Sequence, residues 1–137
     1  MSTEANIAFV QKAYADYRAG NIKAIMDTLA DDIEWIMPGK SLPSSGTFHG
    51  KAGVARFLEI TKETWSSLSL EPRQYIASGD TVAVVGTVSA TARSTGRSLT
   101  TDWVMLWKIR DGKLASFQEM TDTLAAAEAL KPHAATA

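Results

Sequence analysis

The chain has 137 residues, of which 45% are apolar, and this is enough for one domain with a buried core that needs no disulfide or metal. The formal charge of -1 excludes the strong charge of a disordered chain and gives no basic excess of the kind that nucleic-acid-binding proteins carry. The absence of cysteine excludes disulfides, thiolate nucleophiles and cysteine-ligated metals.

Two amphipathic helices are expected at the N-terminus. Ser2 or Thr3 can cap the first helix, which the sequence ends at Gly20, and Asn21 can cap the second directly. Apolar residues recur at helical spacing in both segments. These residues are Ile7, Val10, Tyr14 and Tyr17 in the first helix, and Ile22, Ile25, Met26 and Leu29 in the second.

The middle of the chain predicts a short strand, a loop and a third helix. Residues 33–37 alternate as a strand does and stop at Pro38-Gly39, and residues 47–49 can pair with that strand. The loop between them, residues 40–46, is either a rim over a cavity or a plain surface connection. Helical periodicity then runs from Val54 to Trp65.

Two long segments with a period of two follow. Residues 68–77 form an irregular strand interrupted at Pro72, which fits a sheet edge or a bulge. Residues 81–93 alternate regularly, and Gly86 within them marks the place where we expect the sheet to curl. Thr95-Gly96 can close a hairpin that sets Gly86 beside Met105.

The strongest local signal is Asp111-Gly112 between two apolar alternating runs, which predicts a long hairpin over residues 100–123. A regular register pairs Trp103 with Met120 and Met105 with Gln118 on the inner face. Glu119 then lies on the outer face, where a solvated or interface carboxylate is expected. A bulge in this hairpin would shift the pairing by one residue and turn Glu119 inward.

An alanine-rich helix at residues 124–130 and a disordered tail at residues 131–137 complete the chain. Helices before and after a run of antiparallel strands indicate a single α+β domain over residues 1–137. A strongly curved antiparallel sheet with the N-terminal helices on its concave face would form a cone-shaped barrel. The segment MSTEANIAF does not resemble a secretion signal, so we expect a cytoplasmic protein.

Four motifs in this order resemble the nuclear transport factor 2-like superfamily, and more narrowly its SnoaL-like, ketosteroid-isomerase-related branch. The motifs are DIEWIMPG at 32–39, TFHGKAGVARFL at 47–58, WVMLWKIRDGK at 103–113 and EMTDT at 119–123. The resemblance implies a cone-shaped α+β barrel with an apolar pocket and a homodimer formed through the outer sheet face. On that face the sequence places Val104, Leu106 and Phe117.

The resemblance also implies a function without selecting one, because relatives include isomerases, cyclases, epoxide hydrolases, dehydratases and proteins that only bind partners. The acid/base of the SnoaL-like cyclases matches Asp122 here, and their pocket histidine matches Met105. Asp122 has two open roles. It is a catalytic candidate in an apolar cavity, and it is also placed to cap the last helix, which the sequence favours.

The sequence predicts a protein that binds a small apolar carbonyl compound and acts as a cofactor-independent isomerase or cyclase. The alternative is a non-catalytic module for a small apolar ligand or a protein partner. No metal, cofactor, nucleic acid or membrane is expected as a partner, and a lone His49 is more often a surface residue than a base. The candidate ligand-binding residues are Tyr14, Trp35, Phe57, Trp103, Met105, Gln118 and Met120.

Overall fold

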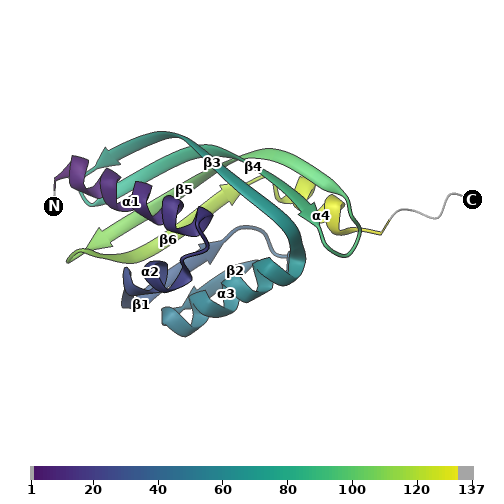
Figure 1. Ribbon diagram of the computed structural model, residues 1–137, viewed down its shortest axis with the longest axis horizontal. Coiled ribbons are helices and arrows are strands. Elements are labelled where there is room, and N and C mark those ends of the chain that lie inside the picture. Colours follow the sequence, from purple (N-terminus) through teal and green to yellow (C-terminus); the bar gives the residue numbers. More distant parts are fainter. Residues whose placement is uncertain (1, 133–137) are drawn as a thin grey trace, which may run out of the picture.

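The computed structural model describes residues 2–132, so most of the tail expected at 131–137 lies outside the described residues. Within the described residues the chain forms four helices and six strands, which are labelled in Figure 1. The helices are α1 (Thr3–Arg18), α2 (Ile22–Asp27), α3 (Gly50–Thr64) and α4 (Thr123–Leu130). The strands are β1 (Leu29–Met37), β2 (Gly46–His49), β3 (Trp65–Ser78), β4 (Thr81–Ala92), β5 (Ser98–Arg110) and β6 (Lys113–Thr121).

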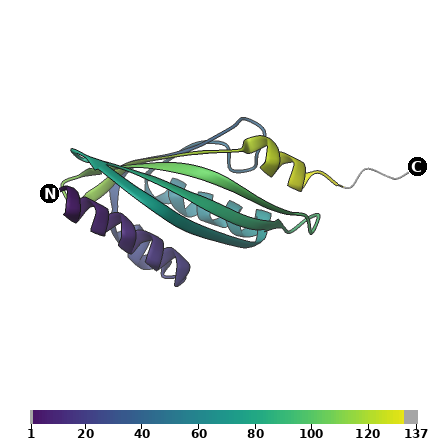
Figure 2. The ribbon, with the colours of Figure 1, turned by 90° about the horizontal axis from the view of Figure 1, so that it is seen from above.

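The six strands form one curved, unclosed sheet in the order β2-β1-β6-β5-β4-β3. The expected α+β architecture is confirmed, with α1 packed against β3 and α3 against β1. One feature of the prediction is wrong, because β1 runs parallel to β6 and the sheet is therefore mixed. The views in Figures 1 and 2 place α4 at the end of the long axis opposite to the N-terminus.

The N-terminal helices begin where the sequence predicts. Ser2 Oγ accepts the N–H of Ala5 at 3.1 Å and caps α1, and Asn21 Oδ1 accepts the N–H of Ala24 at 3.3 Å and caps α2. The second helix is shorter than expected, because it ends at Asp27 and Leu29 already begins β1.

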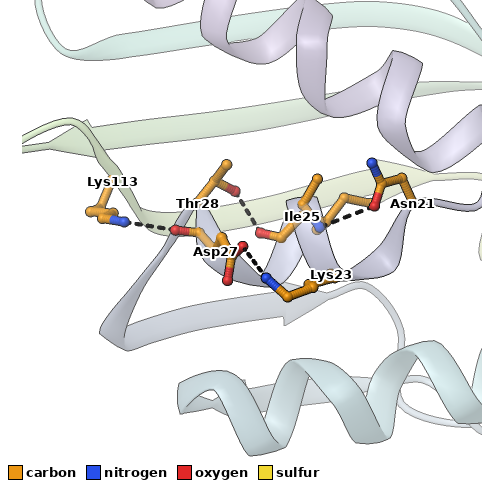
Figure 3. Close-up of polar contacts among 7 residues, drawn as sticks. Asn21, Lys23, Ile25, Asp27, Thr28 and Lys113 are labelled. Atoms are coloured by element: carbon orange, nitrogen blue, oxygen red, sulfur yellow. Dashed lines mark hydrogen bonds and ion pairs between the residues drawn. The ribbon is translucent and has the colours of Figure 1, made fainter.

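The C-terminal end of α2 is held by the β5–β6 hairpin. Figure 3 shows Lys113 Nζ donating to the carbonyl of Asp27 at 2.7 Å and the Thr28 hydroxyl donating to the carbonyl of Ile25 at 2.6 Å. The backbone N–H of Leu114 donates to the carbonyl of Thr28 at 2.8 Å. An isolated helix of six residues is unstable in water, so these bonds fix α2 against the sheet.

The predicted turn at Asp111-Gly112 is confirmed, since both residues have positive φ values of 52° and 74°. The predicted register of the hairpin is wrong beyond its first two pairs. Ile109 lies opposite Leu114, but Lys108 lies opposite Ser116, which leaves Ala115 as an extra residue in β6. This bulge reverses the faces of the rest of the strand.

The β4–β5 register is two residues away from the predicted one, because the connection between these strands is longer than the two-residue turn we assumed. Gly86 lies opposite Trp103 and Val84 opposite Met105. A shift of two residues keeps every side chain on its expected face. The edge position of β3 and its irregularity at Pro72 are confirmed.

Candidate functional site

A largely apolar cavity of about 150 Å³, here called the inner cavity, lies between the helices and the inner face of the sheet. Five of the predicted ligand-binding residues line it, and all five are buried. They are Tyr14, Trp35, Phe57, Trp103 and Met105. Leu42 and Ser44 also line it, so the loop between β1 and β2 forms part of the cavity rim.

The predicted inward orientation of Gln118 and Met120 is wrong. The bulge at Ala115 places both side chains on the outer face, and Met120 is 44% exposed. Phe117 makes the opposite change: it is 2% exposed and stacks on Trp35 with a centroid distance of 3.9 Å. Phe117 is therefore not part of the outer sheet face.

The same bulge brings the carboxyl of Glu119 into the inner cavity. Glu119 lies opposite Met105 in the sheet and lines the cavity among aromatic and aliphatic side chains. Burial raises the pKa of Glu119 to about 7, because the charged form loses its hydration there. A carboxyl with this pKa can both accept and donate a proton near neutral pH.

Asp122 has the capping role that the sequence favoured. Its Oδ1 accepts the N–H of Ala125 at 2.9 Å at the start of α4, and its side chain is exposed. The residue also lines the inner cavity, at its rim rather than in its interior. The hydrogen bond to the helix holds one of its carboxylate oxygens, so Asp122 is less available than Glu119 for proton transfer.

The two tyrosines of α1 differ in what their hydroxyls do. Tyr14 Oη donates to Met105 Sδ at 3.0 Å and accepts the indole N–H of Trp107 at 3.1 Å. Met105, at the position that matches the family's pocket histidine, thus accepts a hydrogen bond from Tyr14. Tyr17 also lines the cavity, and its hydroxyl has no hydrogen-bond partner within residues 2–132.

Burial raises the pKa of the Tyr17 phenol, and the nearby charge of Glu119 raises it further. Tyr17 therefore remains protonated at neutral pH and can donate a hydrogen bond to a ligand oxygen. Glu119 and both tyrosines of α1 line the same cavity. Sequence reasoning treated Tyr17 as a packing residue and so missed it. It expected Glu119 on the outer face and named a bulge as the change that would turn this carboxyl inward as a rival to Asp122, and the bulge is present.

The cavity wall also contains two buried indole N–H groups that have no acceptor among the described residues, those of Trp35 and Trp103. The ring of Trp103 lies directly against Gly86 of the neighbouring strand. Within residues 2–132 no three histidine or carboxylate side chains are placed to hold a metal ion. In the same range, none of the helices has the length and apolar character that crossing a membrane requires.

The family model of the SnoaL-like domain matches residues 10–117. The chain therefore belongs to the SnoaL-like domain family, within the nuclear transport factor 2-like superfamily, as the motifs predicted. No curated protein matches the chain at a significant level.

Solved structures agree with this assignment. A nuclear transport factor 2-like protein from Burkholderia xenovorans is 36% identical with a TM-score of 0.87, and the match covers 96% of this chain and 99% of that one. A protein of unknown function from Burkholderia pseudomallei is 27% identical with the same TM-score and the same coverage. TerC, co-crystallised with polyporic acid, is 33% identical with a TM-score of 0.84, covering 91% of this chain and 97% of TerC.

Proposed function

We propose that the inner cavity binds a small apolar carbonyl compound and that Glu119 transfers a proton at the carbon next to the carbonyl. The observation that carries this proposal is the Glu119 carboxyl, with a pKa of about 7, in a cavity that is largely apolar. Glu119 replaces Asp122 as the acid/base that the family resemblance implied. The co-crystallisation of TerC with polyporic acid supports a ring compound as the ligand.

The proposed reaction uses two groups that line the same cavity, Glu119 and Tyr17. The Glu119 carboxylate removes a proton from the α-carbon, and the electron pair of that C–H bond moves onto the carbonyl oxygen to form an enolate. The Tyr17 hydroxyl donates a hydrogen bond to this oxygen. Return of the proton to another carbon isomerises the compound, whereas attack of the enolate carbon on a second carbonyl closes a ring.

The size of the inner cavity limits the part of the ligand that is fully enclosed. A dry apolar cavity of about 150 Å³ in another protein holds one benzene ring. The inner cavity has about this volume and is lined by Trp35, Phe57 and Trp103. One aromatic ring next to a carbonyl therefore fits best.

The proposal is tested with 2-tetralone, a ketone fused to one benzene ring, by following the exchange of its α-protons for deuterium in heavy water by NMR. The wild-type protein is expected to accelerate the exchange, with a rate that rises through about pH 7 as the Glu119 carboxylate forms. Glu119→Gln should lower the accelerated rate about 100-fold or more, which is the usual effect of losing a general base.

Asp122→Asn is the matched control, because asparagine caps a helix as well as aspartate does and only the carboxylate is lost. This variant is expected to keep the wild-type exchange rate. Equal rates for the wild type and Glu119→Gln would contradict the role of Glu119. Binding of 2-tetralone without any acceleration would leave the cavity as a binding site only, which is the alternative function.

We also propose a homodimer that forms through the outer sheet face. Paired residues place Val104 next to Met120 and Leu106 next to Gln118 on this face, and Ile76 of β3 joins the same apolar stripe with 51% of its surface exposed. Large exposed apolar side chains that lie together favour association. Val104 and Leu106 keep the role that the sequence predicted for them, and Met120 takes the place of Phe117.

Leu106→Lys is expected to convert the dimer to a monomer in sedimentation velocity, because the interface would then bury an unpaired charge. Gln11→Lys, on α1, is the control with the same added charge at an exposed position away from the outer sheet face. A Leu106→Lys variant that sediments as a dimer would place the interface elsewhere.

A further inference from the structure

A second depression, here called the outer groove, lies between the C-terminal end of α1, helix α3 and the first half of β3, and has a volume of about 610 Å³. It shares seven lining residues with the inner cavity, including Tyr17, Leu58 and Trp65. In Figure 1, β3 runs from the end of α3 toward α1, across the space between these helices. The two spaces are therefore neighbours that share one wall, which is the arrangement that a ligand occupying both would need.

Two positively charged side chains line the outer groove, Arg18 at the end of α1 and Lys62 near the end of α3. Both are exposed, and neither forms a hydrogen bond or ion pair through its side chain within residues 2–132. The carboxylate in the groove lining, Glu59, is bound to Arg56 at 3.2 Å. The groove thus has two uncompensated positive charges.

Neither Arg18 nor Lys62 is needed as a hydrogen-bond donor to the last carbonyl groups of its helix. At the end of α1, the carbonyls of Ala15 and Tyr17 accept the backbone N–H groups of Ala19 and Gly20. At the end of α3, the guanidinium of Arg93 donates to the carbonyl of Lys62 at 3.0 Å. Since these helix ends are already satisfied, the charges of Arg18 and Lys62 are available to a ligand.

We propose that the ligand is an amphipathic carboxylate whose apolar ring occupies the inner cavity and whose carboxylate lies between Arg18 and Lys62 in the outer groove. This inference rests on the proposed function, because it specifies the substrate of the same site. A carboxylate in the inner cavity would meet an apolar wall and the Glu119 carboxyl, so the negative charge belongs in the groove. A phosphate dianion is disfavoured more strongly than a carboxylate with a single charge, because both helices end at the groove with the partial negative charge of a C-terminus.

The test compares 4-phenylbutanoate with 4-phenylbutanamide, two ligands of nearly equal size that differ in charge, by calorimetric titration of the full-length protein. The carboxylate is expected to bind roughly five- to tenfold more tightly, the effect of two exposed ion pairs. In the double variant Arg18→Gln/Lys62→Gln the two affinities should become equal. The affinity for 4-phenylbutanoate should fall, whereas the affinity for 4-phenylbutanamide should stay unchanged. Added salt should reduce the wild-type difference.

Arg73→Gln/Lys108→Gln is the control, because it removes two positive charges from exposed positions of β3 and β5 outside both cavities and should keep the preference for the carboxylate. Equal wild-type affinities, a preference that persists in Arg18→Gln/Lys62→Gln, or no measurable binding of either ligand would each overturn the proposal. The calorimetric titration and the deuterium-exchange assay test the two proposals separately, because the preference for the carboxylate does not require the protein to transfer a proton. A wild type that prefers the carboxylate but does not exchange 2-tetralone would refute proton transfer alone.

Discussion

Between about pH 5 and about pH 8, the free energy of unfolding of the wild type is expected to fall by on the order of 2–3 kcal/mol relative to that of Glu119→Gln. Burial raises the pKa of Glu119 from 4.5 to about 7 in the folded protein. Over the interval between these values the folded state keeps its proton while the unfolded state releases it. A rise in pH therefore favours unfolding through this group, and the effect is complete above the folded pKa.

Urea denaturation of both proteins at several pH values measures this difference. Glutamine resembles the neutral carboxyl in size and polarity, so Glu119→Gln should be more stable than the wild type at about pH 8 and similar to it at about pH 5. Glu128→Gln, which changes an exposed carboxyl on α4, should keep the wild-type pH dependence. Stability curves that stay parallel for the wild type and Glu119→Gln would show that Glu119 is fully hydrated in the folded protein.

Trp103→Ala is expected to lower the free energy of unfolding by about 3–5 kcal/mol, the usual effect of removing a buried tryptophan. Trp103 is 2% exposed and stacks against Tyr14 with a centroid distance of 5.7 Å. A Cβ atom at Gly86 would lie 2.4 Å from the Trp103 ring and 2.5 Å from the carbonyl oxygen of Glu71. Gly86→Ala alone should therefore cost about 1–3 kcal/mol through overpacking.

A double-mutant cycle between these positions checks the packing. In the Trp103→Ala background the ring no longer opposes the new methyl group, so Gly86→Ala should cost less by about 0.5 kcal/mol or more. If Trp103→Ala does not fold, Trp103→Phe replaces it in the cycle, because its expected loss of stability is smaller. Ser89→Ala on the same strand is exposed and should change stability by less than about 0.5 kcal/mol in every background. Additive effects at positions 86 and 103 would show that the two residues are not in contact.

Local chemistry was sufficient to predict most of the elements. Asp111-Gly112 fixes its turn because both residues adopt positive φ, and Ser2 and Asn21 cap helices through their own side chains. Pro72 marks an edge strand, since it cannot donate a hydrogen bond to a neighbour. The parallel pairing of β1 with β6 depends on contacts across most of the chain, which no local pattern contains.

The candidate site was harder to predict, because its key carboxyl depends on the bulge at Ala115. One signal for the bulge was present in the sequence. Leu114 and Phe117 are both large and apolar, yet a spacing of three puts them on opposite faces of a regular strand. Both are buried in the structure, 1% and 2% exposed, and the bulge is the local change that permits this. Tyr17 gave no such signal, because its helical spacing also suits a core residue.

The bulge makes the chemistry of the cavity depend on the pairing of β6 as well as on its sequence. Deletion of Ala115 would remove the extra residue and leave Ser116 paired with Lys108 and Glu119 paired with Met105, so Glu119 would still face the cavity. A β6 that kept Ala115 but paired regularly with β5 would instead turn the amide of Gln118 into the cavity in place of the Glu119 carboxyl. A slip of one residue in this pairing is therefore enough to convert the proposed acid/base site into a neutral binding site without any change of sequence.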